Sequence, residues 1–182
     1  MRKYISVTLI VGFVVGVVFL SIFNWSLTLT NTEDFCISCH SMKDNSYAEF
    51  KESMHHKNKS GVRATCSDCH VPKTFFAKIK RKIAASTEVY HTLIGTIDTK
   101  EKYETHRLKM ALNVWQTMTE NDSKACRNCH KVDNMDFEEQ NKSAIKKHIK
   151  AKKEGITCIK CHKGLAHEMP EDGEEEAEKR GL

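Results

Sequence analysis

The most apolar part of the chain lies near its N-terminus. Residues 5–23 contain no ionisable side chain, and as a helix this run would span about 28 Å, close to the hydrocarbon thickness of a bilayer. Arg2 and Lys3 precede the run, whereas Glu33 and Asp34 are the first charges after it. Because basic residues mark the cytoplasmic end of a membrane helix, this pattern predicts a cytoplasmic N-terminus and an exported remainder.

The alternative for this run is a cleaved signal peptide. Signal peptides have an apolar core of about 7–15 residues followed by a cleavage site made of small residues. The run here is longer, and the sequence after it, SIFNWSLTLTNTEDF, offers no such site. We therefore predict an uncleaved transmembrane signal-anchor over residues 1–25, with Trp25 at the membrane interface. Gly12 and Gly16 form a GxxxG pattern, which allows a homodimer through this helix.

Two helices in the second half of the chain are predicted from apolar residues at helical spacing. The first is expected over about 99–119, and the second over about 138–153, ending before Gly155. The core-facing residues of the first are Leu108, Ala111, Leu112, Trp115 and Met118. The chain after Glu171 has almost no apolar content, so residues 171–182 are expected to form an acidic, disordered tail.

The cysteines give the clearest chemical signal. All eight belong to C-x-x-C pairs, and each pair is followed directly by histidine: CISCH, CSDCH, CRNCH and CIKCH. This is the attachment motif of c-type haem, in which two thiols bind the haem vinyl groups and the adjacent imidazole lies below the iron. Zinc sites or disulfides would not require histidine at the same place four times. The predicted thioether cysteines are Cys36, Cys39, Cys66, Cys69, Cys126, Cys129, Cys158 and Cys161.

Four covalent haems change the expected fold. A chain of 20.8 kDa with little apolar core outside its anchor needs the haems to supply that core. We therefore predict a mainly α protein: one transmembrane helix, then a compact multihaem cytochrome c domain over residues 26–170, with short helices, loops and few or no strands.

A basic amphipathic segment lies in the long insert between the second and third motifs. Its apolar residues at helical spacing are Phe75, Phe76, Ile79 and Ile83, and its cations are Lys78, Lys80, Arg81 and Lys82. Two interpretations remain open: a helix at an anionic membrane surface, or a helix packed on the haems with a solvated basic face. Although the net charge is +5, the basic face does not indicate nucleic acid, because this segment is placed outside the cytoplasm.

Each haem iron takes up to two axial ligands. The motif histidines, His40, His70, His130 and His162, offer one each. His55 and His148 are the best second ligands, because each precedes a similar Gly-to-Cys segment in what looks like an internal duplication. His167, in CHKGLAH, could reach a neighbouring haem. The remaining histidines are expected to be surface or supporting residues: His56, His91 and His106.

The sequence resembles the NapC/NirT family of membrane-anchored tetrahaem cytochromes c. The segments that carry the resemblance are NTEDFCISCHSM, SGVRATCSDCHVP, NDSKACRNCH and TCIKCHKGLAH, and it extends from the anchor to His167. Members of that family oxidise quinol at the outer face of the cytoplasmic membrane and pass electrons to a periplasmic reductase, commonly nitrate reductase and in relatives nitrite reductase. The resemblance therefore implies a quinol-dehydrogenase activity within an electron-transfer protein.

The resemblance also implies roles at the first haem. Met42, in CISCHSM, matches an axial methionine, so His40 would not bind that iron. Asp98 matches an acidic residue beside the quinol pocket, where a base must accept protons released from quinol. The residue-level alternatives are packing for Met42 and a helix N-cap for Asp98.

The resemblance assigns the other axial ligands as well. It implies that His55 serves the fourth haem, His148 the third and His167 the second. Two positions depart from the family pattern. Lys73 replaces a histidine, which we expect to be dispensable. Thr87 replaces a lysine near the quinol pocket, so quinol binding would use another cation, for which Lys82 is the candidate, or none.

The predicted protein is thus a single-pass component of the inner membrane with a periplasmic haem domain. Its expected partners are membrane quinol, either menaquinol or ubiquinol, membrane lipid and a periplasmic reductase, with nitrate reductase as the first candidate. The alternatives are electron donation to nitrite reductase or to another oxyanion or N-oxide reductase, and a terminal multihaem reductase. The surplus of histidines argues against the last of these.

Overall fold

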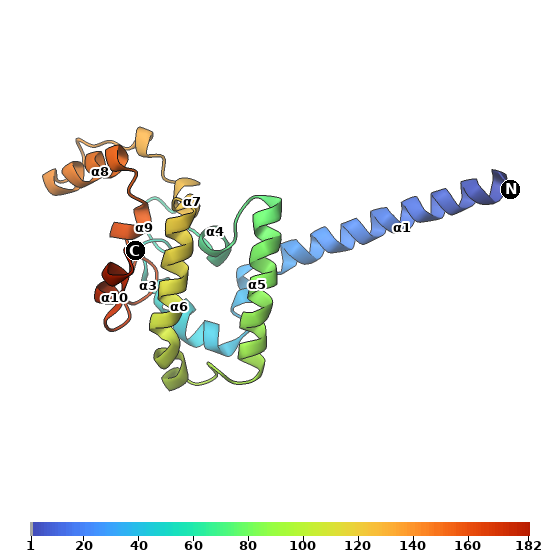
Figure 1. The fold of residues 1–182 in the computed structure, drawn as a ribbon, viewed down its shortest axis with the longest axis horizontal. Helices are drawn as coiled ribbons and strands as arrows, with labels where there is room; N and C mark the ends of the chain where they lie inside the picture. The colour runs from blue at the N-terminus through green and yellow to red at the C-terminus, as the bar shows by residue number, and fades with distance from the viewer. Residues whose placement is uncertain (1) are drawn as a thin grey trace.

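The computed structural model describes residues 2–182 and shows one long N-terminal helix that projects from a domain of shorter helices (Figure 1). Among these residues there are helices, turns and loops but no strand, which confirms the predicted mainly α fold. Met1 and the side chains of Arg2 and Lys3, on which the predicted orientation depends, lie outside what the structure describes.

The projecting helix α1 runs from Arg2 to Leu29. Its apolar part, Tyr4–Leu29, contains an 18-residue stretch with a mean hydropathy of 2.7, and none of that stretch is buried in the rest of the protein. It is therefore long and apolar enough to cross a membrane. The helix continues past residue 25, where the predicted anchor ends, and in this part the side chains of Asn24 and Thr28 bond back to carbonyls one turn earlier.

Each haem motif overlaps a very short helix. The four are α2 (Glu33–Cys36), α4 (Cys66–His70), α7 (Lys124–Arg127) and α9 (Cys158–Cys161). The first is capped by the Thr32 hydroxyl, which accepts the Phe35 N–H, and the second by a reciprocal pair of bonds between Thr65 and Asp68. After the first motif the chain forms a π-helix, η1 (Met42–Ser46), which continues into α3 (Tyr47–Glu52).

Three longer helices frame these motifs: α5 (Phe75–Leu93), α6 (Lys100–Glu120) and α8 (Lys142–Glu154), with a short 3₁₀ turn at Val132–Asn134. The last two confirm the helices predicted over 99–119 and 138–153. The expected end of α8 is also confirmed, because Gly155 closes it with a φ of 66°, in the left-handed region that favours glycine.

The protein's own apolar core is small and is centred on α6. Leu112 and Trp115 of α6 are buried against Ile159 of α9 and Ala177 near the C-terminus. Leu108, Ala111 and Met118 pack at the edge of this cluster, as their spacing predicted. The core thus joins the fourth motif helix to the longest helix of the domain.

The C-terminal segment differs from the prediction of a disordered tail. It forms helix α10 (Gly173–Lys179), which packs on α6. Ala177 is completely buried, and a Cβ on Gly173 would lie 3.2 Å from the Trp115 ring. The Lys163 ammonium lies over that ring and donates to the Leu182 carbonyl. The prediction from average composition did not foresee this helix. A short helix can dock when only one of its faces carries small residues, here Gly173 and Ala177.

Replacing Ala177 with aspartate should release α10 from α6. The substitution buries a carboxylate without a partner, and we expect the haem domain to lose about 1–3 kcal/mol of stability. Thermal unfolding followed by haem absorbance and limited proteolysis of the tail would measure this. Glu174→Ala, at an exposed position of the same helix, is the control and should leave both readouts unchanged. Equal stability of the Ala177→Asp protein would show that the tail does not support the domain.

Candidate haem and quinol sites

The four motifs lie next to one another in chain order. The Cys36 thiol hydrogen-bonds the Cys66 thiol, which lowers the pKa of Cys36 to about 7. Burial raises the pKa values of Cys69 and Cys126, with a smaller contribution at Cys69 from the nearby Cys126 and at Cys126 from the nearby Cys158. The packing of α2 on α4 and of α4 on α7 agrees with this order. The attachment points therefore form a continuous row from the first motif to the fourth.

Three histidines from outside the motifs face three motif histidines. The pairs, with the distance between ring centres, are His70 and His167 at 6.2 Å, His55 and His130 at 6.2 Å, and His148 and His162 at 6.0 Å. An iron held between two imidazoles, at about 2 Å from each ring nitrogen, sets the ring centres roughly 6 Å apart. The three pairs therefore have the separation that two-sided haem ligation requires.

Burial keeps three of these rings, those of His70, His162 and His167, in the neutral form that binds iron. Burial lowers the pKa of His70 to about 4, with smaller contributions from His167 and Arg81. Burial also lowers the pKa values of His162 and His167. A neutral imidazole has a free lone pair for a metal, so the site residues fit four covalent haems, three of them with two histidines each.

The structure brings two of the candidate second ligands to motifs other than those that the resemblance implied. His55 lies beside His130 of the third motif, where the fourth had been implied, and His148 lies beside His162 of the fourth, where the third had been implied. His167 lies beside His70 of the second motif, as implied. The exchange has a physical reason for His148: its helix α8 ends at Gly155, and the chain turns directly into the fourth motif.

The first motif is arranged differently from the other three. His40 is exposed, and its Nε2 lies 3.0 Å from the backbone carbonyl of Asp98. Met42 follows as the first residue of the π-helix and is 39% exposed, which does not fit the alternative of a packed core methionine. π-Helical turns occur often at functional sites because they displace side chains from the regular helical positions. At this motif His40 is bonded to the Asp98 carbonyl, and the exposed thioether of Met42 is the alternative group that could bind iron.

Asp98 lies in the turn between α5 and α6. Its Oδ1 accepts from the Lys102 ammonium at 2.7 Å, and Lys102 also donates to the Gly95 carbonyl at 2.8 Å. Gly95 has a φ of 74°, and a Cβ there would lie 2.9 Å from Asp98 Oδ2, so the turn requires glycine. The N-cap of α6 is Thr99, whose hydroxyl accepts the Lys102 N–H. Asp98 therefore does not cap the helix, and its carboxylate is exposed.

Lys82 of α5 lies near Cys36 of the first motif and is bonded to the residue that follows the membrane helix. Its Nζ donates to the Thr30 carbonyl at 2.7 Å and to the Thr30 hydroxyl at 2.8 Å, directly after the end of α1. Burial lowers the pKa of Lys82, and the neighbouring Cys36 thiol acts in the opposite direction. Lys102, which sequence reasoning did not single out, is the cation bonded to Asp98 itself. Its spacing of four residues from Asp98 was the available signal.

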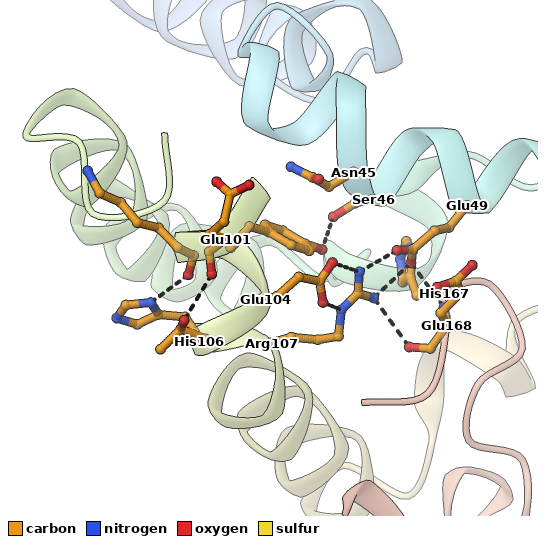
Figure 2. A network of polar contacts seen from close by, with 12 residues as sticks. Asn45, Ser46, Glu49, Glu101, Glu104, His106, Arg107, His167 and Glu168 are labelled. Atoms are coloured by element: carbon orange, nitrogen blue, oxygen red, sulfur yellow. Dashed lines mark hydrogen bonds and ion pairs between the residues drawn. The ribbon is translucent and has the colours of Figure 1, made fainter. Parts of the chain in front are cut away.

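A second set of residues missed by sequence reasoning surrounds His167 (Figure 2). Arg107 of α6 donates two hydrogen bonds to Glu49 of α3 and two to Glu104. Glu49 also accepts the backbone N–H of Glu168, and its Oε2 lies 3.8 Å from His167 Nδ1. The side chains of Arg107 and Glu49 are only 11% and 12% exposed. This network ties the segment that carries His167 to two helices.

The other histidines and the two departures from the family pattern lie outside these pairs. His56 packs against Phe50, and His91 and His106 contact Thr96 and the Lys102 carbonyl. Lys73 forms an ion pair at 2.5 Å with Asp68 inside the second motif, and Thr87 is exposed on α5. Lys73 therefore has a local partner in the motif helix.

Comparison with known proteins extends these observations. A model of the NapC/NirT cytochrome c family, N-terminal region, matches residues 1–172. NapC of Escherichia coli K12 is 50% identical and NirT of Stutzerimonas stutzeri 51% identical, each over 93% of this chain and 85% of its own length. TorC of Escherichia coli K12 is 43% identical over 88% of this chain and 41% of its own length. No solved structure was found to match. The chain, with its four haem-attachment motifs and single membrane anchor, belongs to the NapC/NirT cytochrome c family.

Proposed function

We propose that this protein oxidises membrane quinol at the first haem and passes the electrons to a periplasmic reductase, with nitrate reductase as the first candidate. The observation that carries the proposal is the contact between His40 and the Asp98 carbonyl. It brings a carboxylate and the first haem motif together beside the end of the membrane helix. One relative is described as a denitrification system component, which supports a nitrogen-oxide reductase as the partner class.

The chain's own residues supply what quinol oxidation needs at this site. Oxidation of a quinol to a quinone releases two protons and two electrons, and a carboxylate within hydrogen-bond reach can accept the protons. Asp98 is the proposed base, and Lys102 holds its carboxylate in place. Met42 is the proposed axial ligand, which leaves His40 to fix the Asp98 turn. With Lys82 bonded to Thr30, the site sits where the anchor leaves the membrane.

The remaining motifs suit one-electron relay. When bound, the haems take up single electrons and pass them on. His70, His130 and His162 each have a second histidine opposite, and two histidines of this kind would hold a bound haem iron from both sides, which favours electron transfer over substrate binding. This arrangement supports a relay rather than a terminal reductase. Membrane orientation follows from the same proposal: the N-terminus is cytoplasmic, and the haem domain faces the periplasm of the inner membrane.

Replacing His55 with glycine should leave one haem without its second ligand. We expect one of the four haems to become high-spin by electron paramagnetic resonance, and added imidazole should restore the low-spin signal. The adjacent His56→Gly variant is the control, because His56 packs on Phe50 and should leave the spectrum unchanged. A low-spin spectrum for the His55→Gly protein without imidazole would exclude His55 as a ligand.

Replacing Asp98 with asparagine should slow quinol oxidation by roughly a hundredfold, because the amide cannot accept the proton. Haem reduction by menaquinol and ubiquinol analogues, followed at the α-band in purified protein with all four haems, measures this. Asp133→Asn is the matched control, since Asp133 forms a similar exposed pair with Lys152 away from the first motif. Full activity of the Asp98→Asn protein would exclude Asp98 as the base.

Replacing Lys102 with methionine should change the pH dependence of the same reaction. The hydrogen bond and charge of Lys102 hold the pKa of Asp98 below its ordinary value. Without Lys102 this pKa rises, so the carboxylate becomes protonated at a higher pH, and the acidic limb of the pH–rate profile should move upward in pH. Lys152→Met, which removes the partner of Asp133, should leave the profile in place. An unchanged acidic limb in the Lys102→Met protein would contradict the pairing of these residues in the reaction.

A further inference from the structure

One face of α5 carries large apolar side chains that the rest of the protein leaves exposed. With about 100° of rotation per residue, these side chains fall on one side of the helix. The residues and their exposed fractions are Phe75 53%, Phe76 85%, Ile83 67%, Tyr90 58% and Leu93 80%. Scattered apolar residues are normal on a protein surface, but an exposed stripe of large apolar side chains along a five-turn helix, interrupted at Ser86, indicates a contact surface.

The position of α5 shows which surface this stripe meets. In Figure 1, α5 runs across the direction of α1, and the helices α6, α8 and α9 lie on the side of α5 away from the free end of α1. Lys82, near the middle of α5, is bonded to Thr30, the first residue after α1. A helix that crosses the end of a membrane span lies along the membrane surface, so α5 is placed at the level where α1 emerges.

The charges beside the stripe complement a bilayer that contains anionic lipid. Lys78 and Lys80 lie on opposite sides of the apolar stripe by their spacing, and within residues 2–182 neither forms an ion pair. Arg81 is paired with Glu88, and Lys82 is bonded to Thr30. Long basic side chains beside an apolar helix face extend toward lipid phosphates while their stems stay in apolar surroundings.

We propose that α5 is a second membrane contact, lying in the interfacial region of the leaflet from which α1 emerges. Its apolar stripe enters the boundary between headgroups and acyl chains, and Lys78 and Lys80 meet anionic phospholipid headgroups. This contact fixes the haem domain against the bilayer at a second point, in addition to the single span α1. Lys82 and the turn that carries Asp98, at the end of α5, are thereby held at the membrane surface.

The test uses the full-length holoprotein in vesicles of phosphatidylethanolamine and phosphatidylglycerol. A photo-crosslinking phenylalanine, p-benzoylphenylalanine, replaces Phe76. The matched control carries it in place of Ile149, which is 55% exposed on α8, another basic helix, far from α1 in Figure 1. After irradiation, mass spectrometry should find about tenfold more phospholipid adducts at position 76 than at position 149. A double Lys78→Gln and Lys80→Gln variant should lower the yield at position 76 in these vesicles.

Two results would overturn the proposal. One is an equal yield of lipid adducts at the two positions. The other is a crosslink from position 76 to a second copy of the chain or to another protein in place of lipid. Haem reduction by quinol in the unmodified protein is measured separately, so loss of the lipid contact would leave the proposed quinol oxidation standing. Conversely, a protein that fails to oxidise quinol could still show the adducts at position 76.

Discussion

The haem domain depends on a fixed distance between paired imidazoles. A metal bound on both faces sets its two ligands roughly 6 Å apart, and three histidine pairs in this chain meet that condition. In each pair, one member directly follows the second cysteine of its motif, and each of these motifs overlaps a very short helix. The other must be delivered by a different part of the chain. Most of the remaining structure, including α8 and the Glu49–Arg107 network, positions these second members.

The first motif departs from this arrangement, and its departure gives the protein two distinct ends. At three motifs a second histidine faces the motif histidine, and in the proposed function these motifs serve electron relay. At the first, His40 contacts the Asp98 carbonyl, and an exposed carboxylate with a paired lysine lies close by. Because α1 ends next to this motif, the chemically open site and the membrane meet at one place. The opposite end, near the fourth motif, is covered by α6 and α10.

Local patterns predicted much of this fold. The anchor, the helices α6 and α8 and the Gly155 stop follow from spacing and from the properties of single residues. The C-terminal tail was predicted wrongly because its composition is acidic, whereas its docking depends on Ala177 and Gly173 against the Trp115 ring. The long helix α5 was expected, but whether its apolar stripe would be buried or exposed depended on how the domain packs.

The sequence by itself determined the chemistry. Covalent haem attachment needs two thiols and a histidine within five residues, and a membrane span needs only a long apolar run, so both are written in short continuous segments. Only the tertiary structure decided which distant histidine faces which motif, and it exchanged His55 and His148 relative to the pairing implied by resemblance. It also brought Glu49 and Arg107 to His167, and Lys102 to Asp98. Contacts between distant segments depend on how the helices pack, and no local pattern records that packing.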